Sequence, residues 1–363
     1  MHENFKKHAR NWSAAAALTL ALAGVPAMAQ LTISNEDVDL KFGIQGQFWG
    51  DWTEAPGTEG YAQNLYLRRA RLLFGGDIGS NISFFFQTDD PNLGKTPKAL
   101  GTGFLVQDAF LEWKAANWFR VDGGEMLVPF ARQPLQNTTS YYQVDISNIS
   151  TVNNTSTASS ALRDLGFQAR GFLLQNHLLY RVGMFEGERD SNARNSLRTA
   201  GYVQYDFFDT ETSYTFVGTA LGLKKILAVD GGFDKQSTYR SWSSNVASDT
   251  PVRHGDEIGV NVQYIHYDGQ TKFLAIPDQN DVLGELAYYI HRVKFQPFLA
   301  VSAQNFVAAS ETSKDLNRYG TGINYYIRGQ NLKWTMQYNR IVPRNTTEKS
   351  GNEMTVQLQL FYF

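Results

Sequence analysis

Apolar and polar residues alternate along much of this chain. From Val38 to Trp52, apolar residues stand mostly at even positions and polar residues at odd positions, and the same period of two recurs over 165–173, 258–266 and 332–339. This period places successive side chains on opposite faces of a strand, and no long stretch shows the helical period instead. Pieces of about ten residues separated by Gly, Asn and Asp turns are typical of a transmembrane β-barrel. We therefore predict an all-β fold, a transmembrane antiparallel β-barrel.

Counting these segments from both ends predicts the size of the barrel. The two counts agree in strand direction only if one more strand lies between them, and Tyr239–Ala247 is the available segment, although its alternation is poor. About 16 strands result, with both termini and the turns near 175–177, 291–293 and 328–330 on the periplasmic side. The other segments are 37–52, 61–76, 81–90, 103–114, 117–129, 164–174, 178–187, 198–208, 220–232, 256–267, 281–291, 294–305, 315–327, 331–342 and 352–363.

The final strand has one apolar face and one amide face. Residues 354–363 alternate in this way, although Phe361 and Phe363 fall on the polar face. Such a strand suits a wall between lipid and water, and Phe363 is the candidate signal for assembly into the membrane. A C-terminal strand of a soluble sheet is the alternative interpretation.

The first 29 residues have the pattern of a secretory signal peptide. A basic start precedes a short apolar run, and Ala27 and Ala29 give the small-x-small cleavage pattern, so we expect cleavage after Ala29 and a barrel over 30–363. An uncleaved anchor is the alternative, although the run is short for a membrane helix. Without these residues the chain has 30 basic and 34 acidic groups, and it contains no cysteine.

Composition agrees with a barrel in the bacterial outer membrane. Mean hydropathy is −0.35, and no later apolar run reaches the length of a membrane helix. Aromatic residues make up 13% of the chain, and several form pairs near predicted strand ends, such as Phe207 with Phe208 and Tyr288 with Tyr289. Barrels place such residues at both membrane interfaces, in contact with lipid and lipopolysaccharide. Core aromatics of a soluble β protein remain the alternative.

One connection is much longer than the others. Residues 130–163 join the fifth and sixth predicted strands and form the third outer loop. Connections of this length are usually functional or disordered, and in a channel this one could fold inward and narrow the pore. A mobile surface loop is the alternative. The candidate constriction residues in it are Arg132, Tyr141, Tyr142 and Arg163.

Catalytic and metal-binding patterns are weak. The four histidines after residue 29 are scattered, and no metal-ligand spacing occurs, so we expect no catalytic residue, metal or cofactor. Asp89 and Asp90 precede Pro91, which favours a turn over an acid/base pair. No basic run indicates nucleic acid.

Several motifs resemble the phosphate-selective porin O/P family of outer-membrane porins. They are Leu67–Leu72, Phe84–Asp90, Gln107–Trp113, Phe119–Gly124 with Pro129 and Phe130, and Tyr319–Tyr326 with Lys333 and Trp334. The resemblance covers essentially the whole chain after residue 29. It implies a 16-stranded barrel, commonly a homotrimer, that passes small anions and has an inward-folded third loop.

Phosphate selectivity does not follow from the resemblance. The family's selective members have an arginine ladder along the pore and a lysine cluster at the constriction, whereas the third loop here has no lysine. Alternation also places acids on the pore side, among them Asp108, Glu112 and Asp122, and a wall of mixed sign gives weak selectivity. Arg69 and Arg71 are the best ladder candidates, with ion pairing as their alternative role. The pore-lining and anion-binding candidates are Arg69, Arg71, Arg120, Arg170, Arg181, Lys224, Arg318 and Lys333.

Three functions fit these patterns. The leading hypothesis is a porin, a water-filled channel for passive diffusion of small hydrophilic solutes, with a weak preference for anionic solutes that could extend to phosphate. A barrel scaffold that sheathes a partner in electron transfer or export is the second. A barrel-borne hydrolase is the third.

Overall fold

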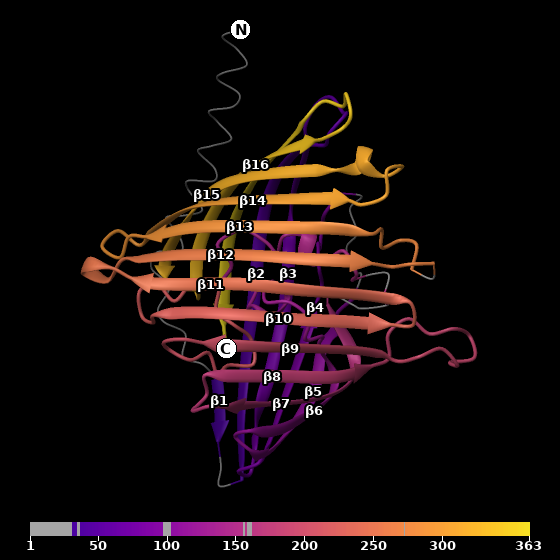
Figure 1. Cartoon of the computed structure of the whole chain (residues 1–363). Coiled ribbons are helices and arrows are strands. Elements are labelled where there is room, and N and C mark those ends of the chain that lie inside the picture. Colours follow the sequence, from indigo (N-terminus) through magenta and orange to yellow (C-terminus); the bar gives the residue numbers. More distant parts are fainter. Residues whose placement is uncertain (1–30, 35–36, 97–102, 155–156, 158–161, 272) are drawn as a thin grey trace. The chain divides into compact units, whose positions relative to one another are not determined.

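The chain folds into a closed antiparallel β-barrel of sixteen strands, β2 to β17, within the residues that the structure describes. The computed structural model describes residues 31–34, 37–96, 103–154, 157, 162–271 and 273–363. Each strand pairs with its neighbour in sequence, as β8 to β14 illustrate in Figure 1, and β17 pairs with β2 from Asn352–Glu54 to Tyr362–Ile44. The predicted fold class and strand number are confirmed. The predicted signal peptide, residues 1–29, lies outside the described residues.

The strand bounds agree with the predicted segments within a few residues at most positions. The short β1 (Leu31–Ser34) was not predicted. The barrel strands are β2 (Val38–Glu54), β3 (Ala62–Ile78), β4 (Ile82–Asp89), β5 (Leu105–Ala116), β6 (Phe119–Leu127), β7 (Arg163–Leu173), β8 (Leu178–Phe185), β9 (Arg198–Asp206), β10 (Ile226–Gln236), β11 (Tyr239–Pro251), β12 (Glu257–Asp268), β13 (Gln279–Tyr289), β14 (Phe295–Phe306), β15 (Leu316–Arg328), β16 (Leu332–Pro343) and β17 (Gly351–Tyr362). In the described part of the chain, 3-10 helices lie at η1 (Gln133–Leu135), η2 (Asn148–Ser150), η3 (Arg253–Gly255) and η4 (Thr312–Lys314).

Burial in the barrel wall is the reverse of that in a soluble protein. On β7, Leu165 and Phe167 are 58% and 70% exposed, whereas Gln168 and Arg170 on the other face are buried. The same alternation of exposed apolar and buried polar residues occurs along the first half of β12. Exposed apolar side chains are stable in contact with lipid, so the outer face suits a membrane and the inner face is polar. Among the described residues, no helix is both long and apolar enough to cross a membrane.

The two ends of the barrel differ in their connections. One end, here the turn end, carries the short connections 79–81, 117–118, 174–177, 290–294 and 329–331 and the C-terminal end of β17. The opposite end, here the loop end, carries most of the longer connections, including 128–162, here the third loop. The three turns predicted to share one side all lie at the turn end.

The connection between β9 and β10 departs from this rule. It spans 207–225 although it belongs to the turn end, because β10 begins at Ile226 and not at residue 220. Leu221 and Gly222 have φ values of 53° and 80°, and the Gly222 amide donates to the Glu257 carboxylate at 2.7 Å. This backbone is a turn, because an extended strand needs negative φ. The prediction that Lys224 lies on a strand is therefore wrong.

Candidate functional site

The third loop hydrogen-bonds to inward side chains of the strands that close the barrel. The Thr138 hydroxyl accepts a hydrogen bond from Gln45 Nε2 of β2 at 2.9 Å. One residue later, the Thr139 carbonyl accepts from Gln359 Nε2 of β17 at 3.1 Å. Both Gln45 and Gln359 are buried on the polar face of the wall. These two bonds attach this part of the loop to the seam between β17 and β2.

The next residues of the loop contact other strands. The Tyr141 carbonyl accepts from Lys333 Nζ of β16 at 3.3 Å, and the Tyr142 carbonyl accepts from Asn324 of β15 at 2.9 Å. The Tyr142 hydroxyl donates to Asp249 of β11 at 2.6 Å. Burial raises the pKa of Tyr141 to about 12, and burial together with Asp249 raises the pKa of Tyr142 well above its ordinary value, so both phenols stay neutral donors at physiological pH.

A charged tether joins the loop to β3. Asp145 forms ion pairs with Arg68 at 2.8 Å and with Arg69 at 2.6 Å. Burial alone would raise the pKa of the Asp145 carboxyl, but the two guanidinium groups lower it well below its ordinary value. Asp145 is thus held as a carboxylate, and Arg69 has a fixed partner in the loop.

A second segment meets the third loop from the turn end. Residues 209–219, here the inner segment, form a parallel bridge with the loop at Gln136 and Phe216. The Asn137 amide donates to the Phe216 carbonyl at 2.8 Å, and the Phe216 amide donates to the Leu135 carbonyl at 2.9 Å. This contact was not predicted from the sequence. Its one signal there was Phe216, a large apolar residue within a connection between strands.

Arg132 strengthens the same contact. Its guanidinium pairs with Glu211 of the inner segment at 2.7 Å and lies 4.9 Å from the centre of the Phe216 ring. Burial would lower the pKa of Arg132, but Glu211 outweighs it and raises the pKa, so the charge persists. Arg132 therefore joins the third loop to the inner segment.

Most of the predicted pore-lining cations have an acidic partner. Arg71 pairs with Asp89 at 2.9 Å. Arg163, which was predicted to belong to the third loop, is instead the first residue of β7 and pairs with Asp108 at 3.2 Å. The remaining contacts are those of Arg170 with Glu112 and with Asp122 at 2.9 Å, Arg120 with Glu112 at 3.5 Å, Arg318 with Glu353, and Arg181 with the Tyr214 carbonyl at 2.6 Å. Apart from Arg181, whose partner is a backbone carbonyl, these arginines lie beside carboxylates that offset their charge.

The predicted cations separate into groups. Arg71, Arg120, Arg163 and Arg170 line one cavity of about 360 Å³, here the inner cavity. Arg318 lines a second cavity of about 260 Å³ near the loop end, together with Asp51, Asp145 and Glu353 among others. Lys333 is buried beside Tyr141, and Lys224 is exposed outside the strands. The structure thus brings together four of the predicted cations.

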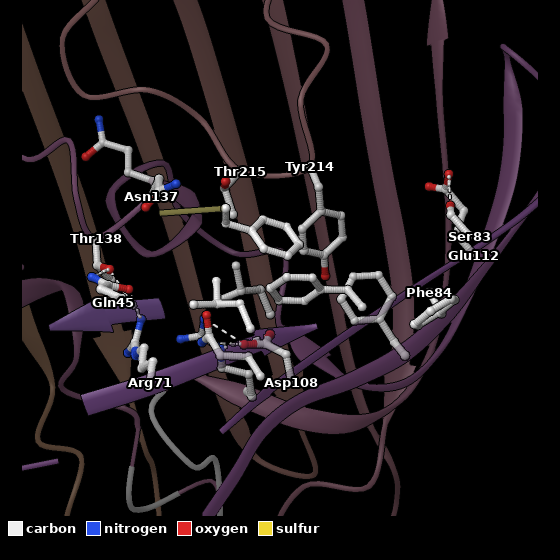
Figure 2. A pocket seen from close by; sticks show the side chains of 18 of the residues that line it. Gln45, Arg71, Ser83, Phe84, Asp108, Glu112, Asn137, Thr138, Tyr214 and Thr215 are labelled. Atoms are coloured by element: carbon white, nitrogen blue, oxygen red, sulfur yellow. Dashed lines mark hydrogen bonds and ion pairs between the residues drawn. The ribbon is translucent and has the colours of Figure 1, made fainter. Parts of the chain in front are cut away.

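The inner cavity also contains a row of aromatic rings that the sequence reasoning did not identify. Phe363 lies against Phe85 with ring centres 5.6 Å apart, Phe85 lies 6.0 Å from Phe110, and Phe110 stacks on Tyr214 at 4.7 Å. Figure 2 shows the Tyr214 ring across the cavity from Arg71. The sequence did contain a signal for these rings, because Phe361 and Phe363 fall on the polar face of the final strand and both line this cavity.

No cluster of metal ligands is present in the described part of the chain. No group of three His, Cys, Asp or Glu side chains there is placed to hold a metal ion.

Comparison with known proteins decides the family. The family model for phosphate-selective porin O and P matches residues 42–249, which is more than half of the chain. The chain belongs to the phosphate-selective porin O and P family. No curated protein matches this porin over its sequence.

Solved structures show the same fold. OmpF of Salmonella typhi in complex with daunomycin has a TM-score of 0.63 at 12% identity, covering 92% of this chain and 100% of that one. The outer-membrane channel DcaP of Acinetobacter baumannii has a TM-score of 0.60 at 12% identity, covering 92% and 100%. The trimer form of OmpT of Vibrio cholerae has a TM-score of 0.55 at 12% identity, covering 90% and 100%. Family and fold together indicate a bacterial outer-membrane channel and point away from an enzyme.

Proposed function

We propose that this porin is a passive, water-filled channel for small hydrophilic solutes, narrowed by its third loop. The observation that carries the proposal is the attachment of one loop to inward side chains of different strands, Gln45 on β2, Asn324 on β15 and Asp249 on β11. A loop bonded in this way crosses the lumen, and residues of the loop line both cavities. Its hydroxyl and amide groups suit a hydrated constriction.

The channel has a weak anion preference. Among the described residues, five cations and two acids line the inner cavity, but each of these cations has an acidic partner within or behind the wall. Strong selectivity needs a ring of one sign, and paired charges do not provide it. The third loop has no lysine, and Lys333, the nearest lysine to it in these contacts, donates to a backbone carbonyl. We therefore infer that the channel passes phosphate as one small anion among others and does not bind it specifically.

Export and assembly complete the proposal. Residues 1–29 act as a cleaved signal peptide, and the exposed apolar face contacts outer-membrane lipid and lipopolysaccharide. The trimer form of OmpT, which shares this fold, supports a homotrimer. Phe363, which follows the last residue of β17, serves in assembly of the barrel into the membrane.

Release of solutes from liposomes tests this function. Purified porin reconstituted into liposomes should release small neutral sugars at rates that fall steeply with sugar size. Heat-unfolded porin is the control. Absence of release for all solutes, with the barrel shown to be folded by its heat-dependent gel mobility, would overturn the proposal.

A further inference from the structure

The inner cavity combines an aromatic wall with hydrogen-bond donors. The rings of Phe363, Phe85, Phe110 and Tyr214 follow one another across it, and Leu73 adds to the apolar wall. Backbone at Gly75 makes room for this row, because a Cβ there would lie 3.1 Å from the Phe363 ring. Adjoining rings of this kind favour contact with an apolar, planar group.

Two buried donors beside these rings have no acceptor. Among the described residues, neither Nη1 of Arg170 nor the hydroxyl of Tyr214 has a hydrogen-bond partner, although both atoms are buried. The Arg170 guanidinium carbon lies 5.3 Å from the centre of the Tyr214 ring, and the other nitrogens of this guanidinium pair with Glu112 and Asp122. Leaving a buried donor unpaired is unfavourable, and a carboxylate oxygen is an acceptor that both groups favour.

We propose that the inner cavity is a binding site for small aromatic carboxylates on their way through the channel. The ligand ring lies along Phe110 and Tyr214, and its carboxylate accepts from Arg170 and from the Tyr214 hydroxyl. The cavity volume of about 360 Å³ lies within the range of about 300–1,000 Å³ typical of small-molecule sites. This inference rests on the proposed channel function and names a substrate class for it.

The chemistry discriminates against other solutes. Phosphate satisfies the donors but leaves the rings without a partner, and a neutral aromatic molecule satisfies the rings but leaves the Arg170 donor unpaired. An aliphatic ring of the same size gains burial without aromatic stacking. Benzoate, cyclohexanecarboxylate and benzyl alcohol therefore separate the contribution of the aromatic contact from that of the carboxylate.

Saturation-transfer NMR on the purified, detergent-solubilised porin measures binding of these three probes, and block of single-channel current measures it again during conduction. Benzoate should bind about threefold to tenfold more tightly than cyclohexanecarboxylate, as expected for one aromatic contact. Phe110→Leu should remove this difference. Tyr214→Phe keeps the ring but removes the hydroxyl, so it should weaken the binding of benzoate and leave the binding of benzyl alcohol unchanged. Phe167→Leu, on the 70% exposed outer face, is the matched control and should change nothing.

The outcomes separate the site from the channel. Equal binding of benzoate and cyclohexanecarboxylate by a porin that releases sugars from liposomes overturns the site and leaves the channel. Preferential binding of benzoate by a porin that releases no solute supports the site and overturns the channel. If Phe110→Leu does not assemble, unchanged benzoate binding by Tyr214→Phe overturns the proposal.

Discussion

Asp145 is predicted to be the main electrostatic tether of the third loop. It pairs with Arg68 and Arg69, and Arg69 is almost fully buried. Removing one partner of a buried pair costs about 3–5 kcal/mol, and we take the lower figure because Asp145 and Arg68 retain some exposure to solvent. A cost of about 3 kcal/mol raises the ratio of detached to attached loop roughly 100-fold. Asp145→Asn should therefore loosen this part of the loop.

Thiol labelling measures that ratio. The chain has no cysteine, so Val144→Cys introduces a single thiol, at a residue buried beside Trp49 and Tyr66. Adding Asp145→Asn should accelerate labelling of this thiol by up to roughly 100-fold, because the thiol reacts only when the loop opens. Asp190→Asn is the control, since that carboxylate bonds within its own loop. Labelling rates that agree within about twofold would refute the reasoning.

Three further predictions follow from the same contacts. Because the pKa of Asp145 is lowered in the folded porin, its ion pairs are complete above the ordinary carboxyl pKa of about 4 and are lost only as pH falls through the lower folded pKa. Open-channel current noise should therefore be constant from about pH 7 to about pH 4 and should rise below about pH 4. Gly218→Ala should displace the inner segment and raise single-channel conductance, because the new Cβ would lie 2.3 Å from the Ser140 carbonyl oxygen, whereas Gly284→Ala has open space and should not. Deletion of Phe363 should lower the folded fraction in outer-membrane preparations, measured by heat-dependent gel mobility; an unchanged fraction would contradict its assembly role.

The barrel could be predicted because its physics is local. Period-two alternation decides which face of each strand meets lipid, and it indicated fifteen of the strands. The sixteenth followed from the requirement that the counts from both ends agree in strand direction. The prediction failed at 220–225, where the predicted start of a strand is instead a turn, with positive φ at Leu221 and Gly222 and a hydrogen bond from Gly222 to the distant carboxylate of Glu257. Such a partner is not visible in the sequence.

The interior was harder to predict because its contacts join distant segments. Alternation placed Arg71 and Asp108 on the inner face, but it could not pair Arg71 with Asp89 or Arg163 with Asp108. It treated Phe361 and Phe363 as errors of register, whereas both rings line the inner cavity. Charge balance and the aromatic wall depend on which residues meet across the lumen, and only the fold defines that.

The reversal potential in a planar bilayer tests the central claim most directly. Single-channel current is recorded under a KCl gradient and then with phosphate added. A weakly selective pore with paired arginines predicts a small anion-directed reversal potential and chloride current that low phosphate concentrations do not block. A reversal potential near the chloride equilibrium value, with block at micromolar phosphate, would show that the arginines act as free anion sites and would contradict the account.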